Sequence, residues 1–220
     1  MTLTIGSKAP NFTAMTTKGM IHFHNWIGDH WCLFFSHPKD FTPVCTTELG
    51  AVARDMPEFE RRGVKVIGLS VDPIEAHHRW KEDIEETQGV SLEYPLISDP
   101  ELAVAKTYGM LPAQTEGVAT DRTAMDNQTA RSVFIIAPNK TIRAAITYPM
   151  TAGRNFTELL RVIDSLQMTD LHKVATPANW QRGEDVIILP ALQDDAAKSA
   201  FPEGWTAPRP YLRFVADPVQ

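Results

Sequence analysis

The chain has 220 residues, of which 43% are hydrophobic and 22% charged, and its formal net charge is −6. This balance is typical of a soluble globular protein, and it gives no electrostatic support for a nucleic acid or for stable membrane association. Two cysteines are too few for a disulfide framework, and the opening MTLTIGSKAP lacks the apolar core of a signal peptide. Both features predict a cytoplasmic protein.

The first half of the chain alternates short apolar runs with helical stretches. Two β-rich runs predict buried strands, WCLFFS (31–36) and VKVIGLSV (64–71). Each leads to a pair that is typical of a helix start, Thr42-Pro43 and Asp72-Pro73. Thr and Asp are good N-caps, and proline fits the first helical position. Glu75, three residues after Asp72, supports the second helix start as part of a capping box.

The pattern changes after residue 130. RSVFIIAP (131–138) and TIRAAITYP (141–149), separated by a tight turn, predict an antiparallel hairpin, and NFTELLRVIDSLQ (155–167) predicts an amphipathic helix. Together with the first half, this order indicates an α/β fold, a thioredoxin-like mixed sheet flanked by helices. We expect this domain to span residues 1–167.

Residues 168–220 differ from the preceding part in composition and contain six of the sixteen prolines. DVIILP (185–190) predicts a strand and QDDAAKSAF (193–201) a short helix. We expect a small carboxyl-terminal α+β domain that is too short to form a core alone. It should pack on the first domain or on another subunit.

Cys45 lies where the helix after Thr42-Pro43 should begin. With Thr42 as N-cap and Pro43 as the first helical residue, Cys45 is the third, in the turn whose backbone N–H groups lack intrahelical acceptors. A thiolate is stabilised at such a position, which activates the sulfur as a nucleophile. From placement alone, a small buried hydrophobic cysteine is an equally good interpretation.

The neighbours of Cys45 favour the reactive interpretation. The Thr42 hydroxyl can donate to the sulfur or accept from an arriving O–H, and Pro38 can shield the sulfur from bulk water. Glu48, one turn later on the same helix face, would by itself oppose a thiolate. A nearby cation is therefore needed.

The pattern Pro38-x-x-x-Thr42-x-x-Cys45 resembles the active-site signature of the peroxiredoxin family. SHPKDFTPVCTTELG resembles the one-cysteine, peroxiredoxin-6 type in particular, and the similarity continues through SVDP, ITYP, GRNF, RVIDSLQ, KVATPANW and YLRF. The resemblance implies that Arg131 is the cation that contacts the sulfur and that Arg154 supports it. For His37, a histidine hydrogen-bonded at a strand end and a direct role in proton handling or substrate approach remain equally open.

The resemblance also implies an activity. Cys45 would reduce hydrogen peroxide and organic hydroperoxides, including those of lipids, to water or alcohols through a sulfenic acid, without a cofactor or a metal. The implied partners are the hydroperoxide, an external thiol from the glutathione or thioredoxin system, and a second copy of the chain in a homodimer.

Cys32 is not expected to resolve the sulfenic acid. The strand from Cys32 to His37 separates its two ends by roughly 16 Å, whereas a disulfide needs Cα atoms within about 7 Å. Cys32 is therefore predicted to pack in the core, and an outside thiol must reduce Cys45.

Two other functions remain as alternatives. A redox sensor or chaperone would use the same activated cysteine. A phospholipase is disfavoured, because the stretch that carries the serine in some relatives reads GDHWC, with His30 in its place, and Asn139 stands where an aspartate is expected. Elsewhere, His77 and His78 are adjacent and should point apart on a helix, which predicts His77 at the surface and His78 in the core.

Overall fold

The computed structural model describes residues 3–112 and 128–219. The chain divides into two compact units, residues 1–156 and 157–220. We call them the first and the second unit. Within the described residues, no helix combines the length and the apolar character needed to cross a bilayer.

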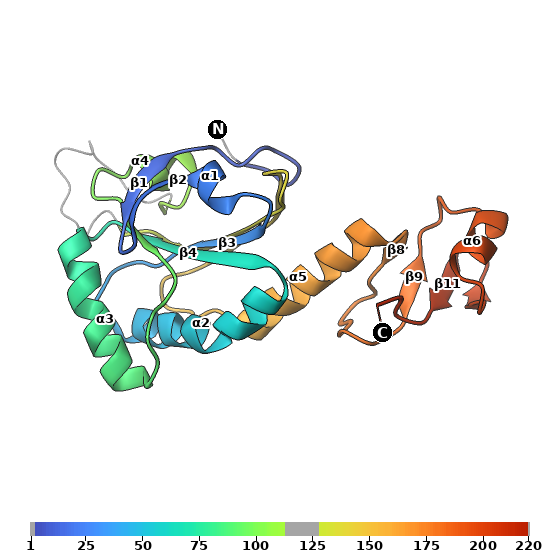
Figure 1. Cartoon of the computed structure of the whole chain (residues 1–220). Helices are drawn as coiled ribbons and strands as arrows, with labels where there is room; N and C mark the ends of the chain where they lie inside the picture. Colours follow the sequence, from blue (N-terminus) through green and yellow to red (C-terminus); the bar gives the residue numbers. More distant parts are fainter. Residues whose placement is uncertain (1–2, 113–127, 220) are drawn as a thin grey trace. The chain divides into compact units, whose positions relative to one another are not determined.

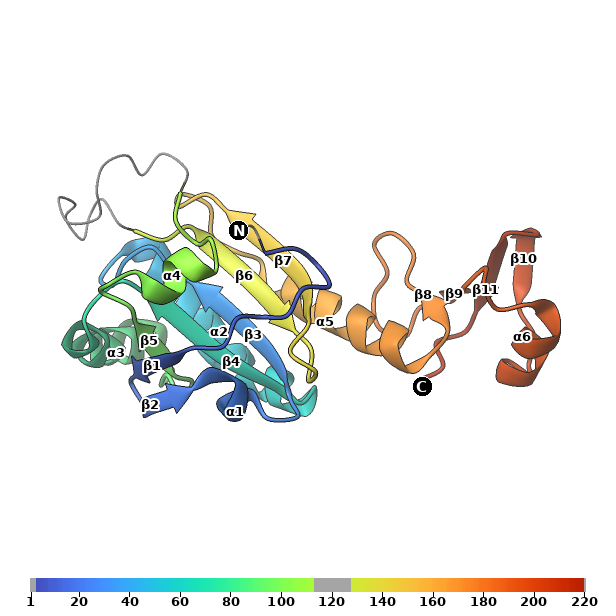
Figure 2. The same ribbon diagram turned by 90° about the horizontal axis from the view of Figure 1, so that it is seen from above.

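The first unit is a mixed sheet with helices on both faces (Figures 1 and 2). Its elements are β1 (Thr13–Thr16), β2 (Gly19–His22), α1 (Phe23–Ile27), β3 (Trp31–Ser36), α2 (Pro43–Arg61), β4 (Val64–Ser70), α3 (Ile74–Gln88), β5 (Leu96–Ser98), α4 (Ala103–Thr107), β6 (Arg131–Ile136) and β7 (Ile142–Tyr148). The strand order in this seven-stranded sheet is β2-β1-β5-β4-β3-β6-β7. Strand β3 is parallel to β4 and antiparallel to β6. The predicted thioredoxin-like mixed sheet is confirmed, including the β6–β7 hairpin.

Alternating side chains of β3 fill the two layers of the core. Cys32 and Phe34 join the cluster on the face of α1 and α4, where Phe34 contacts Tyr108 at 4.9 Å between ring centroids. The opposite face carries Phe35, which packs against Tyr94, and Figure 1 shows α2 and α3 on that side of the sheet. Since successive residues of a strand point to opposite faces, one continuous apolar run supplies both layers.

Helix α2 begins where the sequence predicts, whereas α3 does not. Thr42 is the N-cap of α2 with extended backbone angles, and Pro43 is its first residue. Helix α3 begins at Ile74 with Pro73 as N-cap, so the predicted cap at Asp72 is wrong. The carboxylate of Asp72 instead accepts hydrogen bonds from the backbone N–H of Asp40 (2.9 Å) and from Ser70 (2.8 Å). The carboxylate of Asp72 is therefore part of a buried polar network and does not cap α3.

The second unit has its own small sheet and core. After α5 (Phe156–Leu171), whose first residue closes the first unit, come β8 (Val174–Ala175), β9 (Val186–Ile188), α6 (Asp194–Ala200), β10 (Thr206–Arg209) and β11 (Leu212–Val215). The antiparallel strand order is β10-β11-β9-β8. A buried cluster holds it together and includes Met168 and Trp180.

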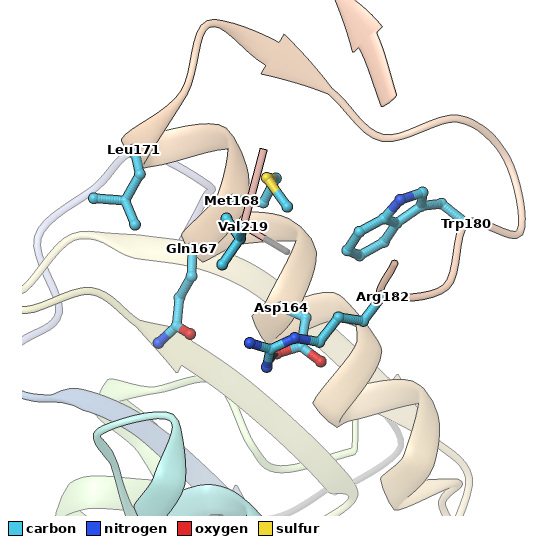
Figure 3. A pocket seen from close by; sticks show the side chains of 7 residues that line it. All are labelled: Asp164, Gln167, Met168, Leu171, Trp180, Arg182 and Val219. Atoms are coloured by element: carbon cyan, nitrogen blue, oxygen red, sulfur yellow. Dashed lines mark ion pairs between the residues drawn. The ribbon is translucent and has the colours of Figure 1, made fainter. Parts of the chain in front are cut away.

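Two expectations about the tail differ from this structure. The tail was expected to be too short for a core of its own, yet its buried apolar side chains, from Met168 to Val215, form one cluster. The two units divide after Phe156, the first residue of α5, whereas the predicted boundary at residue 167 falls further along this helix. Figure 3 shows a hollow of the second unit, lined by Asp164, Gln167, Met168, Leu171, Trp180, Arg182 and Val219. An ion pair of 3.5 Å between Arg182 and Asp164 crosses it.

Candidate active site

The buried thiol of Cys45 meets an arginine from the far half of the first unit. Cys45 is fully buried in the first turn of α2. Arg131, the first residue of β6, is also buried, and its Nη1 lies 3.3 Å from the Cys45 sulfur. The pairing of β6 with β3 brings this guanidinium to the end of the sheet where α2 begins. The cation that the sequence required is therefore in place.

Glu48 joins two arginines beside the sulfur. Its Oε2 accepts from Nη1 of Arg131 at 2.6 Å and from Nη2 of Arg154 at 2.7 Å. Its Oε1 accepts from the backbone N–H and the Nε of Arg154, at 2.8 and 2.9 Å. Burial opposes ionisation of Glu48, but the hydrogen bonds and charge of Arg154, with the charge of Arg131, hold the pKa of the carboxyl below its ordinary value. Glu48 is thus a buried carboxylate between two cations.

Both guanidinium groups are fixed by backbone carbonyls. Arg131 donates from Nε and Nη2 to the carbonyl of Met150, at 2.9 and 2.6 Å. Arg154 donates from Nη1 to the carbonyl of Ser36 at 2.8 Å, and its guanidinium lies 4.9 Å from the centre of the Phe35 ring. Because most of their N–H groups are engaged, these cations are pre-organised around the sulfur.

Thr42 and Pro38 lie just before α2, as the sequence predicts, but the hydroxyl of Thr42 has a different partner than expected. Its hydroxyl donates to the carbonyl of Lys39 at 2.8 Å and makes no side-chain cap of α2. A hydroxyl has one proton, so in this arrangement Thr42 does not donate to the sulfur but keeps lone pairs that can accept from an O–H. Pro38 is buried in the loop before the helix.

His37 is a buried member of a hydrogen-bonded network. Its Nε2 lies 2.8 Å from Oδ1 of Asp40, and its carbonyl accepts from the Thr129 hydroxyl at 2.7 Å. The other carboxylate oxygen of Asp40 lies 2.5 Å from Nδ1 of His77. The structure therefore contains the hydrogen-bonded histidine of the first interpretation, and a direct role in the reaction stays a prediction.

The sequence interpretation missed Asp40 and inverted the two adjacent histidines. His77 is fully buried and His78 is exposed, so the prediction for this pair is wrong. Helical spacing could have found the right one, because His77 shares the buried face of α3 with Trp80 and Ile84, three and seven residues later.

Donor atoms of His37, Asp40 and Asp72 lie within 4.8 Å of one another. Hydrogen bonds already account for this cluster. The Asp40 carboxylate accepts from both histidines, and that of Asp72 accepts from Ser70 and from the Asp40 backbone.

Cys32 behaves as the predicted core residue. It is fully buried in the apolar cluster of the first unit, and both cysteines are free. Burial raises the pKa of the Cys32 thiol far above its ordinary value, and the charge of Lys65 offsets this only in part. Cys32 therefore lacks the thiolate character that reactivity requires.

Comparisons with known proteins cover nearly the whole chain. The model of the AhpC/TSA family matches residues 5–145, and that of the C-terminal domain of 1-Cys peroxiredoxin matches residues 165–204. The 1-Cys peroxiredoxin of Dictyostelium discoideum is 47% identical over 98% of this chain and 86% of the relative. Peroxiredoxin-6 of Rattus norvegicus is also 47% identical, over 98% of each protein.

Two solved structures are similar in both fold and sequence. A cysteine-to-serine mutant of the peroxiredoxin 6 of Arenicola marina aligns with a TM-score of 0.89 at 43% identity, covering 99% of this chain and 100% of that chain. A structure of the yeast mitochondrial 1-Cys peroxiredoxin, which concerns thiol resolution via glutathione/thioredoxin systems, aligns with a TM-score of 0.87 at 48% identity and covers 97% and 99%.

Proposed function

The chain belongs to the peroxiredoxin family, in its one-cysteine group, and on that premise we propose that Cys45 is the peroxidatic nucleophile. The protein is a thiol peroxidase with an antioxidant function. The observation that carries the assignment to Cys45 is the 3.3 Å contact between its sulfur and Nη1 of Arg131. A guanidinium at this distance favours the thiolate over the thiol, and so do the open amides of the first turn of α2.

The reaction begins with in-line attack of the Cys45 thiolate on the distal oxygen of a hydroperoxide. The S–O bond forms as the O–O bond breaks, and Cys45 becomes a sulfenic acid that keeps the hydrogen of the attacked oxygen. The leaving oxygen takes a proton from solvent and departs as water or alcohol. Negative charge moves along the oxygen pair, so donors fixed beforehand stabilise the transition state. Arg131 and the backbone N–H of Cys45 are such donors, while Thr42 accepts the O–H of the substrate.

Hydrogen peroxide and organic hydroperoxides, including those of lipids, are the proposed substrates. The reductant is an external thiol of the glutathione or thioredoxin system. Support comes from the position of Cys32, which is buried in the core with a raised pKa. The yeast relative, whose thiol resolution involves glutathione/thioredoxin systems, supports the same choice.

We place the protein in the cytoplasm as a homodimer. A reducing compartment fits two cysteines that are both free. Within the second unit, Leu171 is 76% exposed and Tyr211 74% exposed. Large apolar side chains with such exposure suit a contact with a second copy. Sedimentation of the purified protein would test the stoichiometry.

Rapid mixing with hydrogen peroxide tests the assignment of the nucleophile. Wild-type protein should consume peroxide quickly, Cys45→Ser should lose this activity, and Cys32→Ser serves as the matched cysteine control. Slow oxidation of Cys45 without turnover in the presence of a thiol would favour the redox sensor instead. A peroxidase rate that survives in Cys45→Ser would refute the assignment.

A further inference from the structure

The hairpin of β1 and β2 presents two methionines to solvent. It lies at one edge of the seven-stranded sheet (Figure 2), and its antiparallel strands place Met15 directly opposite Met20. The other face of the hairpin is apolar and carries Ala14 and Ile21 into the core. Met15 is 43% exposed and Met20 59% exposed. Single exposed apolar side chains are common, but these two are direct neighbours, and core packing does not account for them.

A threonine and a histidine form the next pair on the same face. Thr13 lies opposite His22, two positions along each strand from the methionines, and both are exposed. Since alternate residues of a strand point to the same side, all four side chains share one surface. Oγ1 of Thr13 lies 2.8 Å from Nδ1 of His22. This contact orients the imidazole ring and leaves Nε2 as the nitrogen that can bind a ligand.

The register of the hairpin allows three donor atoms to meet. Cβ atoms of directly opposed residues lie about 4.5–5.5 Å apart, and diagonal neighbours such as Met15 and His22 roughly 7–8 Å apart, which long side chains can span. A methionine side chain is unbranched and has three rotatable bonds, so its sulfur adapts readily to a partner. The sulfurs of Met15 and Met20 and the Nε2 of His22 can therefore converge on a single ion.

The chemistry of these donors determines the class of ion. Thioether sulfur is a soft, neutral ligand that selects Cu(I), and imidazole also suits copper. Zinc is bound by thiolates, imidazoles and carboxylates, and calcium and magnesium by oxygen atoms. Lys18, in the turn of the hairpin, forms an ion pair of 2.9 Å with Glu93, so its positive charge has a counterpart. The surface therefore fits a soft monovalent cation.

We propose that Met15, Met20 and His22 form a binding site for Cu(I), with Thr13 as the positioning residue of the imidazole. The ligands are the two Sδ atoms and Nε2. Nδ1 then carries the proton of the neutral ring and donates it to the Thr13 hydroxyl, as metal-bound histidines commonly do with a neighbouring group. The site shares no residue with the surroundings of Cys45, so this binding function is independent of the peroxidase activity.

Competition for Cu(I) with the chelator bicinchoninate, under anaerobic conditions, tests the site in the full chain. Thiolates also bind Cu(I), so the parent protein for this experiment is the double variant Cys45→Ser/Cys32→Ala. It should withdraw one Cu(I) per chain from the chelator. Failure of this protein to take up Cu(I) would overturn the proposal, and so would Zn(II) bound as tightly as Cu(I).

Variants of the hairpin identify the ligands. In the parent protein, Met15→Leu, Met20→Leu and His22→Gln should each weaken Cu(I) binding by about 10-fold or more, because even the outer partners of a metal ligand contribute roughly 10–100-fold to affinity. Thr13→Val should weaken it by about 10-fold for the latter reason. Met150→Leu, which changes an exposed methionine outside the hairpin, is the matched control. Leucine variants of the hairpin that bind as tightly as the parent would overturn the assignment.

Carbon-13 NMR of the methionine methyl groups gives a second readout, which locates the ion directly. Ag(I) is the probe, because it shares the charge and softness of Cu(I) and is stable in air. One equivalent should shift the methyl signals of Met15 and Met20 together and leave that of Met150 unchanged. A shift of only one hairpin methionine, or an equal shift of Met150, would contradict a site built from both sulfurs.

Discussion

Arg131 and Cys45 are separated by 86 positions in the sequence, yet Nη1 of the arginine lies 3.3 Å from the sulfur of the cysteine. The same nitrogen donates to Glu48. Thiolate and carboxylate therefore share one cation, and this arrangement leads to the first two predictions.

Arg131→Ala should slow the alkylation of Cys45 at pH 7 and lower the second-order rate with hydrogen peroxide by about 10² or more. The variant removes the cation that favours the thiolate and the donor that stabilises the departing oxygen. The rate of iodoacetamide labelling at pH 7 measures the first effect and stopped-flow kinetics the second. Arg79→Ala, which changes an exposed arginine of α3, is the control. An unchanged alkylation rate in Arg131→Ala would contradict this role.

Glu48→Gln should destabilise the fold by roughly 3–5 kcal/mol, because it leaves two buried guanidinium groups without their carboxylate. The midpoint of urea unfolding at pH 7 measures this change.

The pH dependence gives a second check on Glu48. Its folded-state pKa lies below the ordinary value of 4.5. The contribution of the carboxylate to stability is therefore fully present above that value and is lost as the pH falls through the folded pKa. Below pH 4.5, wild-type protein should lose stability more steeply than Glu48→Gln. Parallel curves for the two proteins would speak against the buried charge.

The ion pair of His77 with Asp40 predicts an alkaline effect. The folded-state pKa of His77 is raised above its ordinary value of 6.5. Its contribution is fully present below pH 6.5 and is lost as the pH rises through the folded value. Urea unfolding between pH 6 and pH 9 should show a decline that is absent in His77→Gln. The same decline in both proteins would assign it to another group.

Cys32→Ala should leave peroxide turnover unchanged and cost about 1 kcal/mol of stability, the effect of a small cavity in the core. Mass spectrometry of peroxide-treated wild-type protein should find Cys45 as sulfenic or sulfinic acid. A dominant intramolecular link between Cys32 and Cys45 would show that the buried thiol does resolve the oxidised one.

Local signals in the sequence were sufficient to predict the helix and the strands that carry the site residues. Thr42 and Pro43 begin α2, because a cap and a proline act within one turn of helix. The alternation of β3 and the β6–β7 hairpin also follow from short-range patterns.

Contacts between distant segments were harder to derive. Composition and spacing gave no reason to pair Arg131 with Cys45, and the family resemblance supplied that pairing. Asp72 is predicted as a helix cap, but in the structure its carboxylate accepts a hydrogen bond from the backbone N–H of Asp40, in the loop before α2. His77 was assigned to the surface, because no local rule told which of two adjacent histidines faces the carboxylate of Asp40. Such choices depend on tertiary partners.

The grouping of Arg131, Arg154 and Glu48 around Cys45 has a consequence for the second half of the reaction. With the sulfur ionised, two negative and two positive groups balance. Once the sulfur carries a neutral hydroxyl, the two arginines share the single negative charge of Glu48. We therefore expect the oxidised site to attract an anion, and the thiolate of the reductant is an anion. The same residues would thus favour a neutral peroxide before oxidation and a negatively charged thiolate after it.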